Sequence, residues 1–175
     1  MRNNQDFGVI DSINKTFNMY KNYIWSEIPK LTGVRWKIKS IELRFSSRTQ
    51  NCFPESNRFV IGIRGFKKEW KRKVLCLIIH ESIHLNTAPI NCNLKGIKNR
   101  FNIVEIATCV LTNIMISKVN KKFHVKYPVI HFEEPYKKYE KFEPKLRKLF
   151  YQSKDYKDFL DKIKEQYFEK LTRKK

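Results

Sequence analysis

Apolar residues recur at intervals of three and four along the first part of the chain, which predicts a helix from Phe7 to Lys30. Its apolar face is formed by Val9, Ile10, Ile13, Phe17, Tyr20, Ile24, Trp25 and Ile28. Pro29 and Gly33 are typical of the end of such a helix. A helix with one apolar face needs a partner, and we expect this one to lie across a sheet.

Alternating apolar and polar residues predict strands after this helix. The segment Gly33 to Ser47 alternates with a change of phase at Ser40, which indicates either two strands or one bulged strand. Ser46 to Asn57 is polar and contains Pro54, which predicts a loop. Arg58 to Arg64 alternates again, and we expect a further strand there.

Two further stretches contain long apolar runs and predict buried helices, although the first turns of the earlier one are rich in lysine and arginine. The first extends from Lys67 to Asn86 and the second from Phe101 to Ser117. Between them, Thr87 to Asn99 contains Pro89 and Gly96 and is expected to be a loop.

The last third of the chain changes character after Asn120. Lys121 to Phe132 is expected to be irregular, and amphipathic patterns predict helices over Pro135 to Phe150 and Ser153 to Thr172. The whole pattern predicts one α+β domain over residues 1–175, with an N-terminal helix, a small mixed β-sheet, two buried helices and C-terminal helices. Residues 7–120 form its core, and residues 121–175 are an extension that either enlarges the core or covers a cleft.

The first buried helix carries the motif HExxH at positions 80 to 84. Positions i and i+4 lie on one helical face, so His80 and His84 are expected to direct their imidazoles at one point. Such a pair suits Zn²⁺, which prefers nitrogen and sulfur ligands in tetrahedral geometry. Glu81 is then placed to act as a general base toward a water molecule that the metal activates.

The second buried helix has a single charged residue between Phe101 and Ser117, which is Glu105. A carboxylate in a buried helix needs a partner, and a metal ion is a suitable one. We therefore expect His80, His84 and Glu105 to bind one zinc ion per chain. The alternative is that Glu105 only interacts favourably with the dipole at the start of its helix.

The chain has a formal net charge of +20 over 175 residues. This charge favours acidic partners, but the basic residues form no recognisable reading motif, so we expect nucleic acid to bind weakly and without specificity, if at all. No apolar run reaches the roughly 20 residues of a membrane span, and the N-terminus lacks a signal-peptide pattern. We expect a cytoplasmic monomer that does not bind membranes.

Four cysteines form no CxxC pair, which argues against a zinc ribbon and a disulfide framework. Cys76 and Cys109 fall in the apolar helical runs and are expected in the core. Cys92 follows His84 in the predicted loop, and we expect an ordinary loop residue there rather than a metal ligand.

The motif His80-Glu81-x-x-His84, followed by Glu105 on a second helix, resembles the gluzincin zinc metallopeptidases, and the order of elements is most similar to that of the small minigluzincins. The resemblance implies that His80, His84 and Glu105 bind zinc and that Glu81 is the catalytic base. It also implies a peptide or protein substrate, held in extended form by an edge strand ahead of the motif helix. Arg58 to Arg64 is the strand in that position.

The chain departs from this family at one position. Many gluzincins carry an acidic residue four positions after the glutamate ligand, whereas this chain has Cys109 there. Support for the zinc-binding histidines is therefore expected from another group. A donor for the oxyanion is also needed, and His131, Tyr127 and His124 are the candidates.

Two alternatives to a zinc endopeptidase remain at this point. A SprT-like protease that acts on DNA-bound proteins would use a histidine as third ligand, which would be His124 or His131 in place of Glu105. A non-enzymatic module would keep the zincin fold and its metal for binding, although such a module has no need for Glu81.

Overall fold

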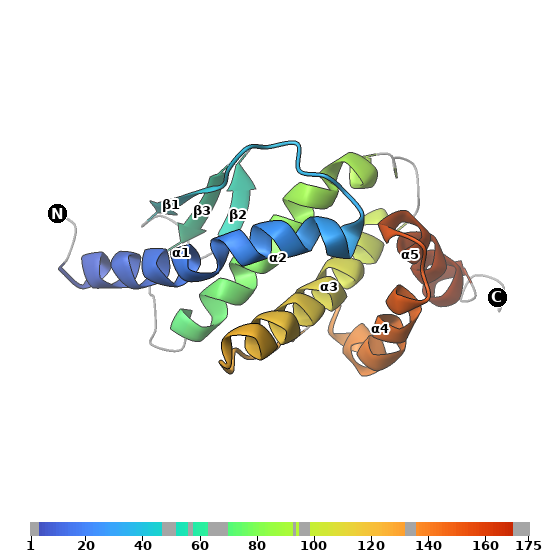
Figure 1. The fold of residues 1–175 in the computed structure, drawn as a ribbon. Helices are drawn as coiled ribbons and strands as arrows, with labels where there is room; N and C mark the ends of the chain where they lie inside the picture. The colour runs from blue at the N-terminus through green and yellow to red at the C-terminus, as the bar shows by residue number, and fades with distance from the viewer. Residues whose placement is uncertain are drawn as a thin grey trace.

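A small mixed sheet lies at one side of a mostly helical fold, which confirms the predicted α+β class (Figure 1). The computed structural model describes residues 4–46, 52–55, 58–62, 70–92, 94, 99–131 and 136–169. In chain order the elements are α1 (Asn4–Thr32), β1 (Glu42–Ser46), β2 (Cys52–Glu55), β3 (Arg58–Gly62), α2 (Trp70–Cys92), α3 (Arg100–Phe123), a 3₁₀ helix (Lys137–Phe142), α4 (Glu143–Tyr151), α5 (Tyr156–Ile163) and a π-helix (Lys164–Glu169).

The sheet has the strand order β1-β3-β2. β3 runs parallel to β1, with Glu42 opposite Arg58, and antiparallel to β2, with Cys52 opposite Ile61. The expectation that β3 is an edge strand is therefore wrong, because both of its edges are paired. The loop predicted over Ser46 to Asn57 is also wrong for residues 52–55. Pro54 concealed β2, although an edge strand tolerates proline.

α1 joins the sheet to the rest of the fold. In its first half, Ile13 and Phe17 pack with Phe59 and Ile61 of β3, as expected for a helix that lies across a sheet. Its second half packs in the main core with α2 and α3. The helix ends at Gly33, whose φ of +71° suits glycine and whose N–H donates to the carbonyl of residue 29 over 2.9 Å.

The segment between α1 and β1 is not the predicted strand over residues 34–39, because its contacts are with helices. The ring of Trp36 stacks on Trp25 at a centroid distance of 4.3 Å, and its Nε1 donates to the Trp25 carbonyl over 2.8 Å. Asn86 of α2 donates to the Val34 carbonyl over 2.9 Å. The alternation of apolar and polar residues in this segment therefore does not mark a strand.

α2 and α3 form an antiparallel hairpin at the centre of the molecule (Figure 1). Both are longer than predicted: α2 continues through Pro89 to Cys92, so that its last six residues replace part of the expected loop. α3 continues to Phe123, where His124 adopts a φ of 54° and its N–H caps the helix on the Asn120 carbonyl. By length and composition α3 could span a membrane, but 72% of its most apolar window is buried within the fold.

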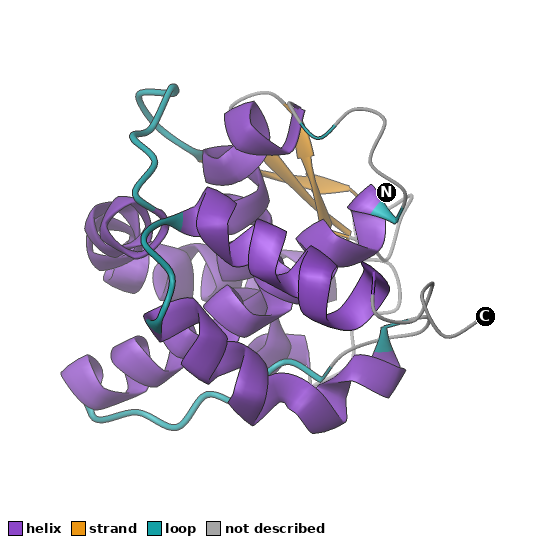
Figure 2. Ribbon diagram, turned by 90° about the vertical axis from the view of Figure 1, so that its right-hand side faces the viewer, coloured by secondary structure: helices purple, strands orange, loops and turns teal. Residues whose placement is uncertain are grey.

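The chain beyond α3 turns back along that helix before it reaches α4. The segment over residues 125–131 is irregular, as predicted, and α3 side chains hold it: Asn120 binds the backbone of Tyr127, and Asn113 binds the backbone of Ile130. Figure 2 views the molecule from the side of the C-terminal helices, with the strands of the sheet behind other helices.

α4 and α5 bury their apolar faces in the main core. Leu146 and Leu149 of α4 and Tyr156 and Phe159 of α5 belong to the same cluster of buried residues as the apolar side chains of α3. These contacts favour the interpretation that residues 121–175 enlarge the core.

We predict that Phe159→Ala, which empties a fully buried site, lowers the free energy of unfolding by about 3–5 kcal/mol. Tyr151→Ala is the matched control, because Tyr151 is 66% exposed and its loss should change stability by no more than about 0.5 kcal/mol. Urea titration of both variants measures the difference. Equal stabilities would contradict the inclusion of α5 in the core.

Candidate metal centre

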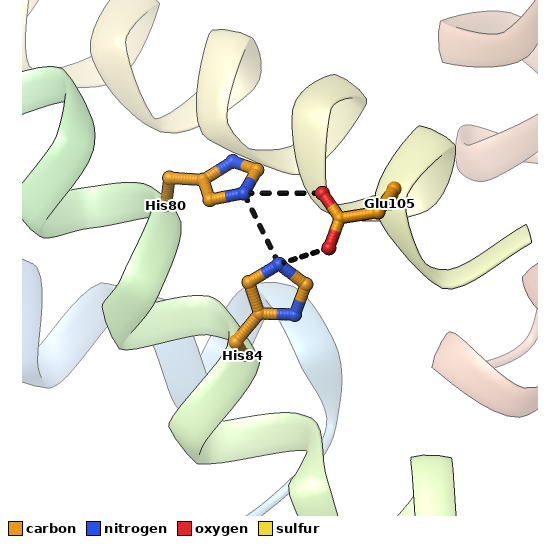
Figure 3. A group of neighbouring side chains, drawn as sticks. All are labelled: His80, His84 and Glu105. Carbon is orange, nitrogen blue, oxygen red and sulfur yellow. Dashed lines mark hydrogen bonds and ion pairs between the residues drawn. The ribbon is translucent and has the colours of Figure 1, made fainter. Parts of the chain in front are cut away.

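Three side chains from the central hairpin converge at one point (Figure 3). His80 and His84 lie one turn apart on α2, and their Nε2 atoms are 3.1 Å from each other. Glu105 on α3 faces both, with Oε2 3.4 Å from His80 Nε2 and Oε1 3.0 Å from His84 Nε2. The structure therefore brings together the three residues that the sequence predicted as ligands.

The geometry of this group fits a zinc ion. Ligand bonds of 2.0–2.1 Å in a tetrahedron place neighbouring ligand atoms about 3.3 Å apart. The three separations between His80, His84 and Glu105 lie from 3.0 to 3.4 Å, close to this value, and the two histidines face different oxygens of the Glu105 carboxylate. Two imidazole nitrogens and one carboxylate leave the fourth position of a catalytic zinc site free. These residues are consequently able to hold the ion without rearrangement of the helices.

Glu105 remains ionised in this group. Burial would raise the pKa of its carboxyl, but hydrogen bonds from His80 and His84, together with their charges, outweigh burial and hold the pKa below its ordinary value. A carboxylate that stays charged at neutral pH is suitable as a metal ligand.

Glu81 lies beside the group but is not part of it. Burial raises the pKa of its carboxyl, the charge of Glu105 raises it further, and His80 and His84 act in the opposite direction. The net effect is a pKa above the ordinary value. Glu81 is therefore a stronger base than a solvated glutamate, as a proton acceptor requires.

A threonine on α3 supports His80. The hydroxyl oxygen of Thr112 lies 3.5 Å from His80 Nδ1, and its proton is donated to the Thr108 carbonyl over 2.7 Å. The oxygen is thus left to accept a hydrogen bond from Nδ1–H, and in that tautomer the lone pair of Nε2 is available to a metal ion. Thr112 is therefore placed to orient the His80 ring, which was expected from a group other than Cys109.

The group opens into a pocket of about 500 Å³ between α2 and α3. The described residues that line it are His80, Glu81, His84, Ala88, Asn91, Cys92, Arg100, Phe101, Val104 and Glu105. Cys92 is exposed and shares the pocket, but it follows His84 by two helical turns, or about 12 Å. No described residue of the C-terminal extension lines the pocket.

The candidate oxyanion donors lie elsewhere. Tyr127 binds the side chain of Asn120, which follows Glu105 by about 22 Å along α3, and its hydroxyl donates to Tyr20. His131 pairs with Glu140 on the surface, and His124 ends α3. The structure places none of the three histidine and tyrosine candidates among the described residues of the pocket.

The sequence interpretation missed the far wall of the pocket, which includes Ala88, Asn91, Arg100 and Phe101. Residues 87–99 were expected to form a loop, so helical spacing was not applied there. A longer α2 would have placed residue 88 one turn beyond His84 and on the same face. In the same way, Phe101 lies one turn before Glu105.

We compared the chain with protein-family models, with curated proteins and with solved structures, and none of the three comparisons found a match. The motif and the geometry of the site therefore carry the functional argument.

We predict one tightly bound zinc ion per chain. Glu105→Ala should lower the zinc affinity by more than the 10–100-fold that follows the loss of a group hydrogen-bonded to a ligand. Metal analysis after dialysis against a competing chelator measures both. His131→Ala and His124→Ala are the controls and should retain full zinc. If either of them loses zinc while Glu105→Ala keeps it, the third ligand has been assigned wrongly.

We also predict that Thr112→Val lowers zinc affinity about tenfold, because it removes the acceptor for His80 Nδ1–H at nearly constant volume. Thr112→Ser keeps the hydroxyl and should retain most of the affinity. Competition with a zinc-binding dye distinguishes the two variants, and equal affinities would show that the hydroxyl does not support His80.

Proposed function

We propose that this chain is a zinc-dependent metallopeptidase of the gluzincin type. The observation that carries the proposal is the convergence of His80, His84 and Glu105 within 3.0–3.4 Å, with Glu81 beside them in an open pocket. The motif predicts His80, Glu81 and His84, and the single charge of the next helix predicts Glu105, so sequence and geometry support the proposal together.

His80, His84 and Glu105 would hold the zinc ion. When bound, zinc supplies Lewis-acid polarisation of the peptide carbonyl and lowers the pKa of a water molecule. Glu81 would accept the proton of the attacking water and deliver it to the leaving amine. Because burial raises the pKa of Glu81 above its ordinary value, its carboxylate binds this proton more readily than a solvated glutamate does.

An extended substrate needs a free strand edge, and β3 has none. Of the two edge strands, β2 (Cys52–Glu55) contacts α2, the helix that carries the motif. The family resemblance gave the role of substrate-binding strand to residues 58–64. We assign this role to β2 instead. A peptide would lengthen the sheet at this edge and pass in front of the HExxH helix.

The SprT-like alternative is less well supported. It requires a third histidine ligand, but His131 pairs with Glu140, whereas Glu105 lies within 3.4 Å of both motif histidines. A purely structural zinc site would be closed by four protein ligands. Here three ligands face an open pocket, and this favours catalysis over a binding module.

We predict that Glu81→Gln retains zinc and loses at least about a hundredfold in peptide hydrolysis, because it removes only the group that moves the proton. Cleavage of an internally quenched peptide library measures turnover, and metal analysis of the same sample shows that the site is loaded. Retained turnover in this variant would refute the assigned base.

A further inference from the structure

The pocket carries positive charge at the end away from the metal-ligand group. Among the described residues that line the pocket, Arg100 is the only lysine or arginine, and it lies there together with Phe101. The sequence from Ser82 to Val104 contains no aspartate or glutamate. The Arg100 guanidinium lies over the Phe101 ring, 4.6 Å from the centroid. No salt bridge to a carboxylate within 4.0 Å is found for Arg100 in the described part of the chain.

Helix stability does not explain this arginine. Arg100 is the first residue of α3, and the first turn contains no acidic residue. A cation at this end opposes the helix dipole and slightly destabilises the helix. Phe101 is 70% exposed, so the stacked pair is not part of the core either. Arg100 and Phe101 do line the pocket, so a role in binding a ligand there would account for them.

The distance from Arg100 to the ligand group suits a peptide. Arg100 precedes Glu105 by five residues, which is a rise of about 7.5 Å along α3. An extended peptide advances about 3.3 Å per residue. A substrate whose scissile bond lies at the ligand group would therefore place its second or third neighbouring residue beside Arg100. On the opposite wall Ala88 is small and leaves room for that residue.

We propose that Arg100, held by its stack on Phe101, binds a substrate carboxylate two or three residues from the scissile bond, so that the enzyme selects acidic peptides. This inference rests on the proposed peptidase function and adds the substrate class. The guanidinium offers paired donors that match a carboxylate. That carboxylate belongs either to an aspartate or glutamate side chain or to the free C-terminus of the substrate.

Internally quenched peptides on an alanine scaffold test the proposal. One position at a time, within three residues of either side of the scissile bond, carries Glu or Gln, and each peptide is made with a free or an amidated C-terminus. We expect the wild-type protein to prefer Glu at one position, or the free C-terminus, by about tenfold in kcat/KM. The first result assigns a side-chain carboxylate and the second a terminal one.

Variants then identify the group responsible. Arg100→Gln should abolish the preference, and Arg100→Glu should favour Lys over Glu at the same position. Lys121→Gln is the control: it removes one charge from the same helix about 30 Å away and should keep the preference. Metal content and thermal melting establish that each variant is loaded and folded. A preference that survives in Arg100→Gln, or no preference in the wild type, overturns the proposal.

Binding separates this inference from the proposed function. The zinc-loaded Glu81→Gln protein should bind the preferred Glu peptide about tenfold more tightly than its Gln counterpart in calorimetry, and the difference should vanish in Glu81→Gln/Arg100→Gln. If the wild type cleaves no peptide but this binding difference is present, the peptidase function fails and carboxylate recognition stands. If peptides are cleaved without discrimination, the function stands and this inference fails. Absence of both overturns both.

Discussion

The antiparallel contact between α2 and α3 is the constraint on which the site depends. Both helices are apolar on nearly all sides and are buried, yet each brings ionisable groups into their interface. An isolated histidine or glutamate is costly to bury. Here Glu105 lies between His80 and His84, so each group satisfies the others. A slip of one residue would rotate Glu105 by about 100° and leave all three groups without partners. The apolar contacts of the hairpin therefore fix the geometry of the site.

The rest of the chain keeps this hairpin in register. α1 ties to α2 through Thr32, whose hydroxyl donates to Asn86 over 2.6 Å. On the other side, Tyr156 of α5 is fully buried, and its hydroxyl donates to Asn91 in the last turns of α2. Burial raises the pKa of Tyr156 to about 12, so this hydroxyl remains a donor at neutral pH. The C-terminal helices thus hold the wall of the pocket in addition to enlarging the core.

The sequence predicted those features that depend on local pattern. Helical spacing located the helices, and the motif identified His80, Glu81 and His84. Glu105 was found because it is the only charge between Phe101 and Ser117. The order of the strands was not predictable, since pairing partners are set by tertiary contacts. Pro54 and Pro89 were each taken as breaks, but one lies in an edge strand and the other inside a helix. The second error concealed the pocket wall. The contact of Thr112 with His80 depends on the rotation of α3 about its axis, which only the structure shows.

Cys109, four residues after Glu105, places no further charge in the interface between α2 and α3. Glu81 and Glu105 already place two carboxylates beside one another, and together they balance one divalent cation. The negative charge of Glu105 raises the pKa of Glu81. A third carboxylate on α3 would leave an uncompensated buried charge and favour protonation of the group that has to act as base. Thr112 instead orients His80 with a neutral hydroxyl, and its own proton is taken up by a carbonyl of the same helix. A hydroxyl can thus accept the hydrogen bond that a carboxylate would accept, and it adds no charge to the site.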